Sequence, residues 1–248
     1  MSARLPGRRR RRASLLVSAI VVGAGLGASA VGGSAAGLPL SSVGLTPYAT
    51  CLLTATPSTT TVVADDEVRQ GNATTNYGTQ TTLNIASSGT ANRRVYLSFD
   101  LSTCAPPIPA SATVRLATLR LYVTSLPAVC RTIDIFRVGS AWAESTLTWN
   151  NQPFGTVLNS PASTTRTDSF DAGTPTGCEN RTTATYLTGA TVTADVAAFV
   201  ANTATNAGWM LRDDVEGSAT ARTVTFSAKN LGTLAQAPQL VITYVVTP

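Results

Sequence analysis

Residues 95–101 read VYLSFDL, and residues 117–123 read ATLRLYV. In both stretches every second residue, counted from the first, is apolar, and most of the residues between them are polar. This period of two is typical of a β-strand that packs one face against a core and turns the other away from it. The two stretches therefore predict two half-buried strands.

The rest of the chain repeats this pattern at short intervals. Turn-forming Gly, Pro and Asn residues separate further apolar runs, which predict strands over residues 133–138, 209–212, 223–228 and 240–246. Many short strands indicate an all-β fold, an antiparallel β-sandwich that is jelly-roll-like.

Two segments depart from the strand pattern. Residues 193–202 read TADVAAFVAN, with apolar residues at helical spacing, and predict one short helix with Thr193 as its cap. Residues 159–188 form a long polar stretch that predicts a surface loop.

The N-terminal region has the composition of an export signal. Arg4 and the Arg run at 8–12 precede an apolar segment, and small residues follow it. This order predicts a signal peptide over residues 1–36, a flexible lead-in over 37–62 and the sandwich over 63–248. An uncleaved membrane anchor is the alternative, but beyond Val22 the leader is mostly Gly, Ala and Ser, which partition weakly into lipid. We expect a secreted, extracellular protein without membrane contact after cleavage, exported by either the general or the twin-arginine route.

Removal of the leader changes the charge of the chain. The whole sequence has 18 basic and 13 acidic residues, and six of the basic residues lie within residues 1–12. Residues 1–36 contain no acid, so residues 37–248 carry 12 basic and 13 acidic residues, a net charge of −1. A nucleic-acid partner is not expected, because the basic character belongs to the export signal.

Four cysteines follow the leader, and an even number in an exported chain predicts two disulfides. Three pairings are open. We favour Cys104–Cys130, which flanks one predicted strand, and Cys51–Cys178, which attaches the N-terminal segment to the long loop. A zinc site is disfavoured, because the chain has no His and no CxxC spacing.

Several motifs in order resemble the DNRLRE domain family, which is similar to disaggregatase-related domains and to carbohydrate-binding module family 96. The motifs are VRQG at 68–71, TNYG at 75–78, YLSFDL at 96–101, LRLY at 119–122, WAESTLTWNNQP at 142–153, ADV at 194–196, GWMLR at 208–212 and PQLVITY at 238–244. The resemblance implies an extracellular jelly-roll domain that in some members binds acidic polysaccharide such as alginate. The chain departs from the pattern before Val68, where Asp66 and Glu67 replace the usual aromatic, and it contains only one Lys.

Residues suited to catalysis are scarce. With no His, neither a Ser-His-Asp nor a Cys-His arrangement can form. The acidic runs at 65–67 and 213–216, with Glu144 and Asp195, provide carboxylates, but no two are marked as a pair for glycoside hydrolysis. We interpret these runs as solvated loops and expect no cofactor; a structural Ca²⁺ ion bound by clustered carboxylates is the alternative.

A ligand surface is predicted from strand parity. Arg94, Tyr96, Arg120 and Tyr122 point away from the predicted core faces, and pairing of their two strands would gather them into one patch. Guanidinium groups bind carboxylates with paired hydrogen bonds, and Tyr rings offer a flat apolar face. Arg69, Arg93 and Tyr77 extend the predicted patch. The alternative is that these side chains only support cross-strand pairing.

Together these features predict a secreted, non-catalytic carbohydrate-binding module that binds polysaccharide as a monomer. Two other functions stay open. One is a structural or adhesive domain of the cell surface, and the other is a polysaccharide lyase or hydrolase.

Overall fold

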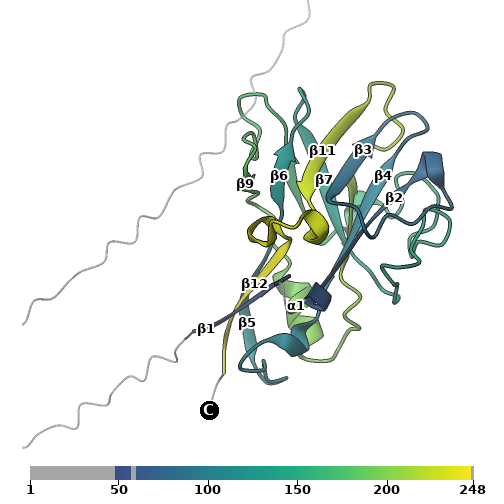
Figure 1. Cartoon of the computed structure of the whole chain (residues 1–248). Helices are drawn as coiled ribbons and strands as arrows, with labels where there is room; N and C mark the ends of the chain where they lie inside the picture. The colour runs from purple at the N-terminus through teal and green to yellow at the C-terminus, as the bar shows by residue number, and fades with distance from the viewer. Residues whose placement is uncertain (1–47, 57–59, 247–248) are drawn as a thin grey trace, which may run out of the picture. The chain divides into compact units, whose positions relative to one another are not determined.

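The computed structural model describes residues 48–56 and 60–246 (Figure 1). The predicted signal peptide and most of the predicted lead-in lie outside the described residues. A three-stranded antiparallel sheet runs in the order β1 (Ala49–Thr54), β12 (Gln239–Val245) and β5 (Thr113–Arg120). Residues 49–54 thus form a strand that pairs along β12, and the prediction of a flexible lead-in is wrong for them.

The second sheet is larger and also antiparallel. Its order is β8 (Asp168–Ala172), β7 (Arg131–Arg137), β10 (Trp209–Asp213), β4 (Arg93–Phe99), β3 (Thr82–Ser87), β11 (Arg222–Ser227), β6 (Tyr122–Ser125) and β9 (Thr185–Tyr186), and β2 (Val63–Arg69) pairs with β4. Short 3₁₀ turns lie at Thr60–Val62, Gln70–Asn72, Leu101–Thr103, Ser163–Thr165, Lys229–Leu231 and Leu234–Gln236. The predicted all-β sandwich is confirmed.

The main core follows the predicted alternation. Val95, Leu97, Leu119 and Val123 are all buried within one hydrophobic cluster. The one α-helix among the described residues, α1 (Thr193–Val200), contributes Val196, Phe199 and Val200 to this cluster. The helix is where the sequence places it, but Thr193 does not cap it, because its Oγ1 accepts a hydrogen bond from the backbone N–H of Ala117 at 2.9 Å.

A second, smaller core lies on the other face of the larger sheet. Tyr96, Phe136 and Met210 project from β4, β7 and β10 and pack against Leu147 and Trp149 of the segment between β7 and β8. This segment therefore covers the central strands and removes their outer face from solvent. The stretch predicted to be a surface loop, residues 159–188, contains β8 and β9 as well as connections.

Both disulfides form, but the predicted pairing is wrong. The bonds are Cys51–Cys104 and Cys130–Cys178. Cys130 immediately precedes β7, and Arg131 pairs with Ala172 at the end of β8, so the loop after β8 brings Cys178 close. Among the described residues no helix has the length and apolar character needed to cross a membrane.

Candidate functional site

Arg94 and Tyr96, the centre of the predicted ligand surface, are fully buried. Arg94 donates to both carboxylate oxygens of Glu216, at 2.8 and 2.9 Å, and to the carbonyl oxygens of Gly155 and Val157. The Tyr96 hydroxyl donates to Gln152 Oε1 at 3.0 Å, and burial raises the pKa of Tyr96. The prediction that these side chains face solvent is wrong, because the segment after β7 covers them.

Arg120 and Tyr122 lie in a different part of the molecule. The strand predicted over residues 117–123 is divided between the two sheets, because Arg120 ends β5 and Tyr122 begins β6 (Tyr122–Ser125). β4 pairs with neither β5 nor β6, so the predicted pairing does not occur. The Arg120 guanidinium lies 4.7 Å from the ring centroid of Tyr186, which makes an edge contact with Tyr122 at 5.4 Å. These residues form a separate, partly exposed cluster.

Arg69, Arg93 and Tyr77, the predicted extension of the patch, do come together. Arg69 of β2 is the register partner of Arg93 of β4, and the Arg69 guanidinium lies 3.7 Å from the centroid of the Tyr77 ring. Buried Glu67 accepts from Arg69 at 2.6 Å and from Arg93 at 3.2 Å. One carboxylate thus orients two partly exposed guanidinium groups beside an aromatic ring.

Neighbouring polar groups extend this arrangement onto β3. Glu67 Oε2 accepts from the backbone N–H and the side-chain amide of Asn84, at 2.8 and 2.7 Å. Asn84 Oδ1 in turn accepts from the Thr225 hydroxyl of β11 at 2.9 Å. We call Glu67, Arg69, Tyr77, Asn84 and Arg93 the β2 cluster.

A hollow of about 310 Å³, which Lys229 and Glu144 help to line, lies near the start of β2. Lys229, the only Lys of the chain, donates to the Val63 carbonyl oxygen at 2.7 Å and to the carboxylate of Glu144. Gly78 packs closely against the backbone of Glu144 beside this hollow. A Cβ atom at position 78 would lie only 2.6 Å from the carbonyl oxygen of Glu144, so a larger residue would not fit. No local pattern marks Lys229, because it and Asn230 lie far along the chain from the other residues of the hollow.

Two buried carboxylates lie beneath this hollow. Burial is the main cause that raises the pKa of Asp65 and of Asp66, each to about 7. Asp65 Oδ2 accepts from the backbone N–H of Lys229 at 2.7 Å, whereas its Oδ1 has no hydrogen-bond partner in the described part of the chain. The prediction of a solvated acidic loop at 65–67 is therefore wrong, because all three residues lie within β2 and are buried.

This burial makes stability depend on pH. Because the pKa of Asp65 in the folded protein lies above its unfolded value near 3.8, its contribution is fully present below pH 4 and is lost as the pH rises through 7. Between pH 4 and 8 we expect Asp65→Asn to gain up to about 4 kcal/mol in unfolding free energy relative to wild type. Urea denaturation at several pH values measures this change. For the control Glu179→Gln, which replaces an exposed acid, the difference in unfolding free energy from wild type should not change with pH. A difference for Asp65→Asn that is equally independent of pH would contradict the role of Asp65 burial.

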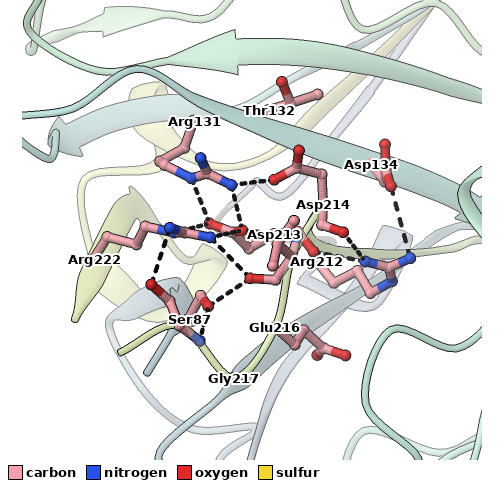
Figure 2. A network of polar contacts seen from close by, with 12 residues as sticks. Ser87, Arg131, Thr132, Asp134, Arg212, Asp213, Asp214, Glu216, Gly217 and Arg222 are labelled. Atoms are coloured by element: carbon pink, nitrogen blue, oxygen red, sulfur yellow. Dashed lines mark hydrogen bonds and ion pairs between the residues drawn. The ribbon is translucent and has the colours of Figure 1, made fainter. Parts of the chain in front are cut away.

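The carboxylates of the second acidic run, residues 213–216, form ion pairs with arginine side chains (Figure 2). Arg131 and Arg222 both donate to Asp213, and Arg131 also contacts Asp214. Burial would raise the pKa of Asp213, but the hydrogen bonds from the two guanidinium groups outweigh it and lower the pKa. Within residues 48–56 and 60–246, no group of three or more His, Cys, Asp or Glu side chains is placed to hold a metal ion.

The geometry of β2, β3 and β4 lies within the region that matches a known family. Residues 56–172 match the model of carbohydrate-binding module family 96. The similarity predicted from the sequence motifs is confirmed over this span, which includes the whole β2 cluster but not Lys229. The family 96 match supports a carbohydrate-binding module. No curated protein matches the chain.

Proposed function

We propose that the protein is a secreted, non-catalytic module that binds acidic polysaccharide through the β2 cluster. The observation that carries the proposal is the pair of partly exposed guanidinium groups of Arg69 and Arg93, in register on β2 and β4 and beside the Tyr77 ring. Two guanidinium groups bind carboxylates along a sugar chain, and the ring packs against an apolar sugar face.

Export and a binding role are supported by separate features. The leader has the order of a signal peptide, and both disulfides suit an oxidising compartment. All four cysteines are bonded and the chain has no His, so the usual thiol and imidazole nucleophiles or bases are missing. These features favour recognition without chemistry.

The test is affinity electrophoresis of the purified protein in gels that contain a polyuronate. We expect the double variant Arg69→Gln/Arg93→Gln to weaken binding at least about 10-fold, because each lost charged hydrogen bond contributes more than 1 kcal/mol. Tyr77→Ala should also weaken binding while leaving both charges in place. Added salt should weaken wild-type binding, since the guanidinium groups are partly exposed.

Arg115→Gln is the matched control, because Arg115 is exposed on β5 of the other sheet. Unchanged retention of the double variant would contradict the proposed site. Release of unsaturated or reducing sugar ends during incubation would instead indicate a lyase or a hydrolase, and binding to cells without binding to any glycan would indicate an adhesive domain.

A further inference from the structure

A second hollow, of about 350 Å³, lies where β7 extends beyond β8. β8 begins at Asp168, opposite Ile135, so the last two residues of β7, Phe136 and Arg137, continue past it. We call the site the β7 hollow and define it by Phe136, Arg137, Phe154, Arg166, Thr167 and Asp195. Its volume lies at the lower end of the range for small-ligand sites, which is about 300–1,000 Å³.

Two arginines on the β7 hollow present their guanidinium groups to solvent. The side chains of Arg137 and Arg166 are 45% and 41% exposed. Their carboxylate partners lie inward, since the side chains of Asp195 and Asp134 are only 10% and 0% exposed. A ligand that enters the hollow therefore meets positive charge first.

The inner carboxylate that orients Arg137 is itself fixed. Asp195 Oδ2 accepts from the Thr167 hydroxyl at 2.6 Å and from the indole N–H of Trp209 at 2.9 Å. Its other oxygen accepts from Arg137 at 3.3 Å, the one side-chain hydrogen bond of Arg137 within the described residues. The remaining N–H groups of Arg137 can donate to a ligand.

Asp134 orients Arg166, as Asp195 orients Arg137. Its Oδ2 accepts from the Ser163 hydroxyl at 2.8 Å and lies 3.7 Å from Arg212, which Figure 2 shows beside it. Its Oδ1 is buried without a hydrogen bond in the described chain and lies 3.6 Å from Arg166. Arg166 also donates to the Ser163 carbonyl oxygen at 3.1 Å, which holds its guanidinium over the hollow.

An aromatic wall completes the site. Phe154 is partly exposed and packs against buried Phe136, with ring centroids 6.2 Å apart. An aromatic ring beside polar hydrogen-bonding groups suits a sugar, which has apolar C–H faces and a polar edge.

We propose that the β7 hollow is a second subsite that binds one carboxylate-bearing sugar residue. Arg137 and Arg166 donate to the carboxylate, and the sugar ring packs on Phe154. The inference rests on the proposed function, because it takes the same class of polymer as ligand. The β7 hollow is separate from the β2 cluster. Arg137 of β7 and Leu97 of β4 are both register partners of Trp209 on β10, whereas Arg93 lies further along β4, beyond Val95. Two subsites on one chain would increase the apparent affinity for a long polymer.

The indole N–H of Trp209 provides the reporter for an experiment. It bonds to the carboxylate that orients Arg137, so occupation of the hollow should shift its signal in ¹⁵N NMR spectra. We would titrate the purified protein, with both disulfides formed, with a uronate disaccharide and with a neutral disaccharide. The uronate should shift the Trp209 signal, and Arg166→Gln should weaken this binding about 10-fold. Arg166→Lys should retain part of it, and Arg115→Gln all of it.

The outcomes separate the subsite from the proposed function. A Trp209 signal that does not move while Arg69→Gln/Arg93→Gln abolishes binding would overturn the subsite and leave the proposed function intact. Equal shifts with the neutral disaccharide would overturn the role of the carboxylate. Persistence of the Trp209 shift in Arg69→Gln/Arg93→Gln, and its loss in Arg166→Gln, would support an independent subsite even if the β2 cluster proves not to bind.

Discussion

Arg94→Ala is expected to lower the free energy of unfolding by about 3–5 kcal/mol, because it leaves the buried carboxylate of Glu216 without its ion-pair partner. The variant also removes the donors that hold the carbonyl oxygens of Gly155 and Val157. Urea denaturation at pH 7 measures the loss.

Arg115→Ala is the control for this experiment, since Arg115 is exposed, and it should change stability by less than about 0.5 kcal/mol. Replacing both partners with apolar residues, as in Arg94→Met/Glu216→Leu, should cost less than Arg94→Ala alone. A loss below about 1 kcal/mol for Arg94→Ala would mean that Arg94 is hydrated, and it would revive Arg94 as a ligand-binding residue.

Cys51→Ala/Cys104→Ala is expected to cost about 4 kcal/mol, since the disulfide closes a loop between residues 53 positions apart. The bond also ties β1 to the segment that follows β4, just after the 3₁₀ turn at Leu101–Thr103, and its loss should release β1 from β12. Thermal unfolding of the variant measures the effect, and peptide mapping of the unreduced wild type checks the pairing. A peptide that links Cys104 to Cys130 would contradict the structure and restore the pairing predicted from the sequence.

Much of the fold could be predicted from local patterns. Alternation identified β4, β5 and the strands near residues 133, 209, 223 and 240, and helical spacing identified α1. These signals are local, because burial of one face imposes a period on neighbouring residues. The disulfide pairing could not be predicted this way, since it depends on which strands become neighbours.

The error at Arg94 and Tyr96 has a specific cause. Parity correctly placed both side chains on the face opposite Val95 and Leu97, but it carries no information on what covers that face. The cover is the segment that contains Leu147, Trp149 and Gln152, about 50 residues away in the sequence. The apolar residues Phe136 and Met210 on neighbouring strands were the available signal that the same face is buried.

Prediction of the proposed binding residues was limited in the same way. Arg69 and Tyr77 could be named because they lie within the motifs at 68–71 and 75–78, and Arg93 because it lies two residues before a predicted strand. Arg137 and Arg166 were missed, since their common site depends on Asp195 and Asp134, which lie 58 and 32 positions away from them. A lone Arg at a strand end or in a polar loop has no local feature that distinguishes it from other surface charges.

The structure of the protein in complex with a uronate tetrasaccharide would show whether acidic polysaccharide binds at the β2 cluster. We expect a sugar carboxylate within hydrogen-bond distance of the Arg69 and Arg93 guanidinium groups, with a sugar ring against Tyr77. A tetrasaccharide bound only at the Arg120–Tyr186 cluster, with the β2 cluster empty, would contradict it.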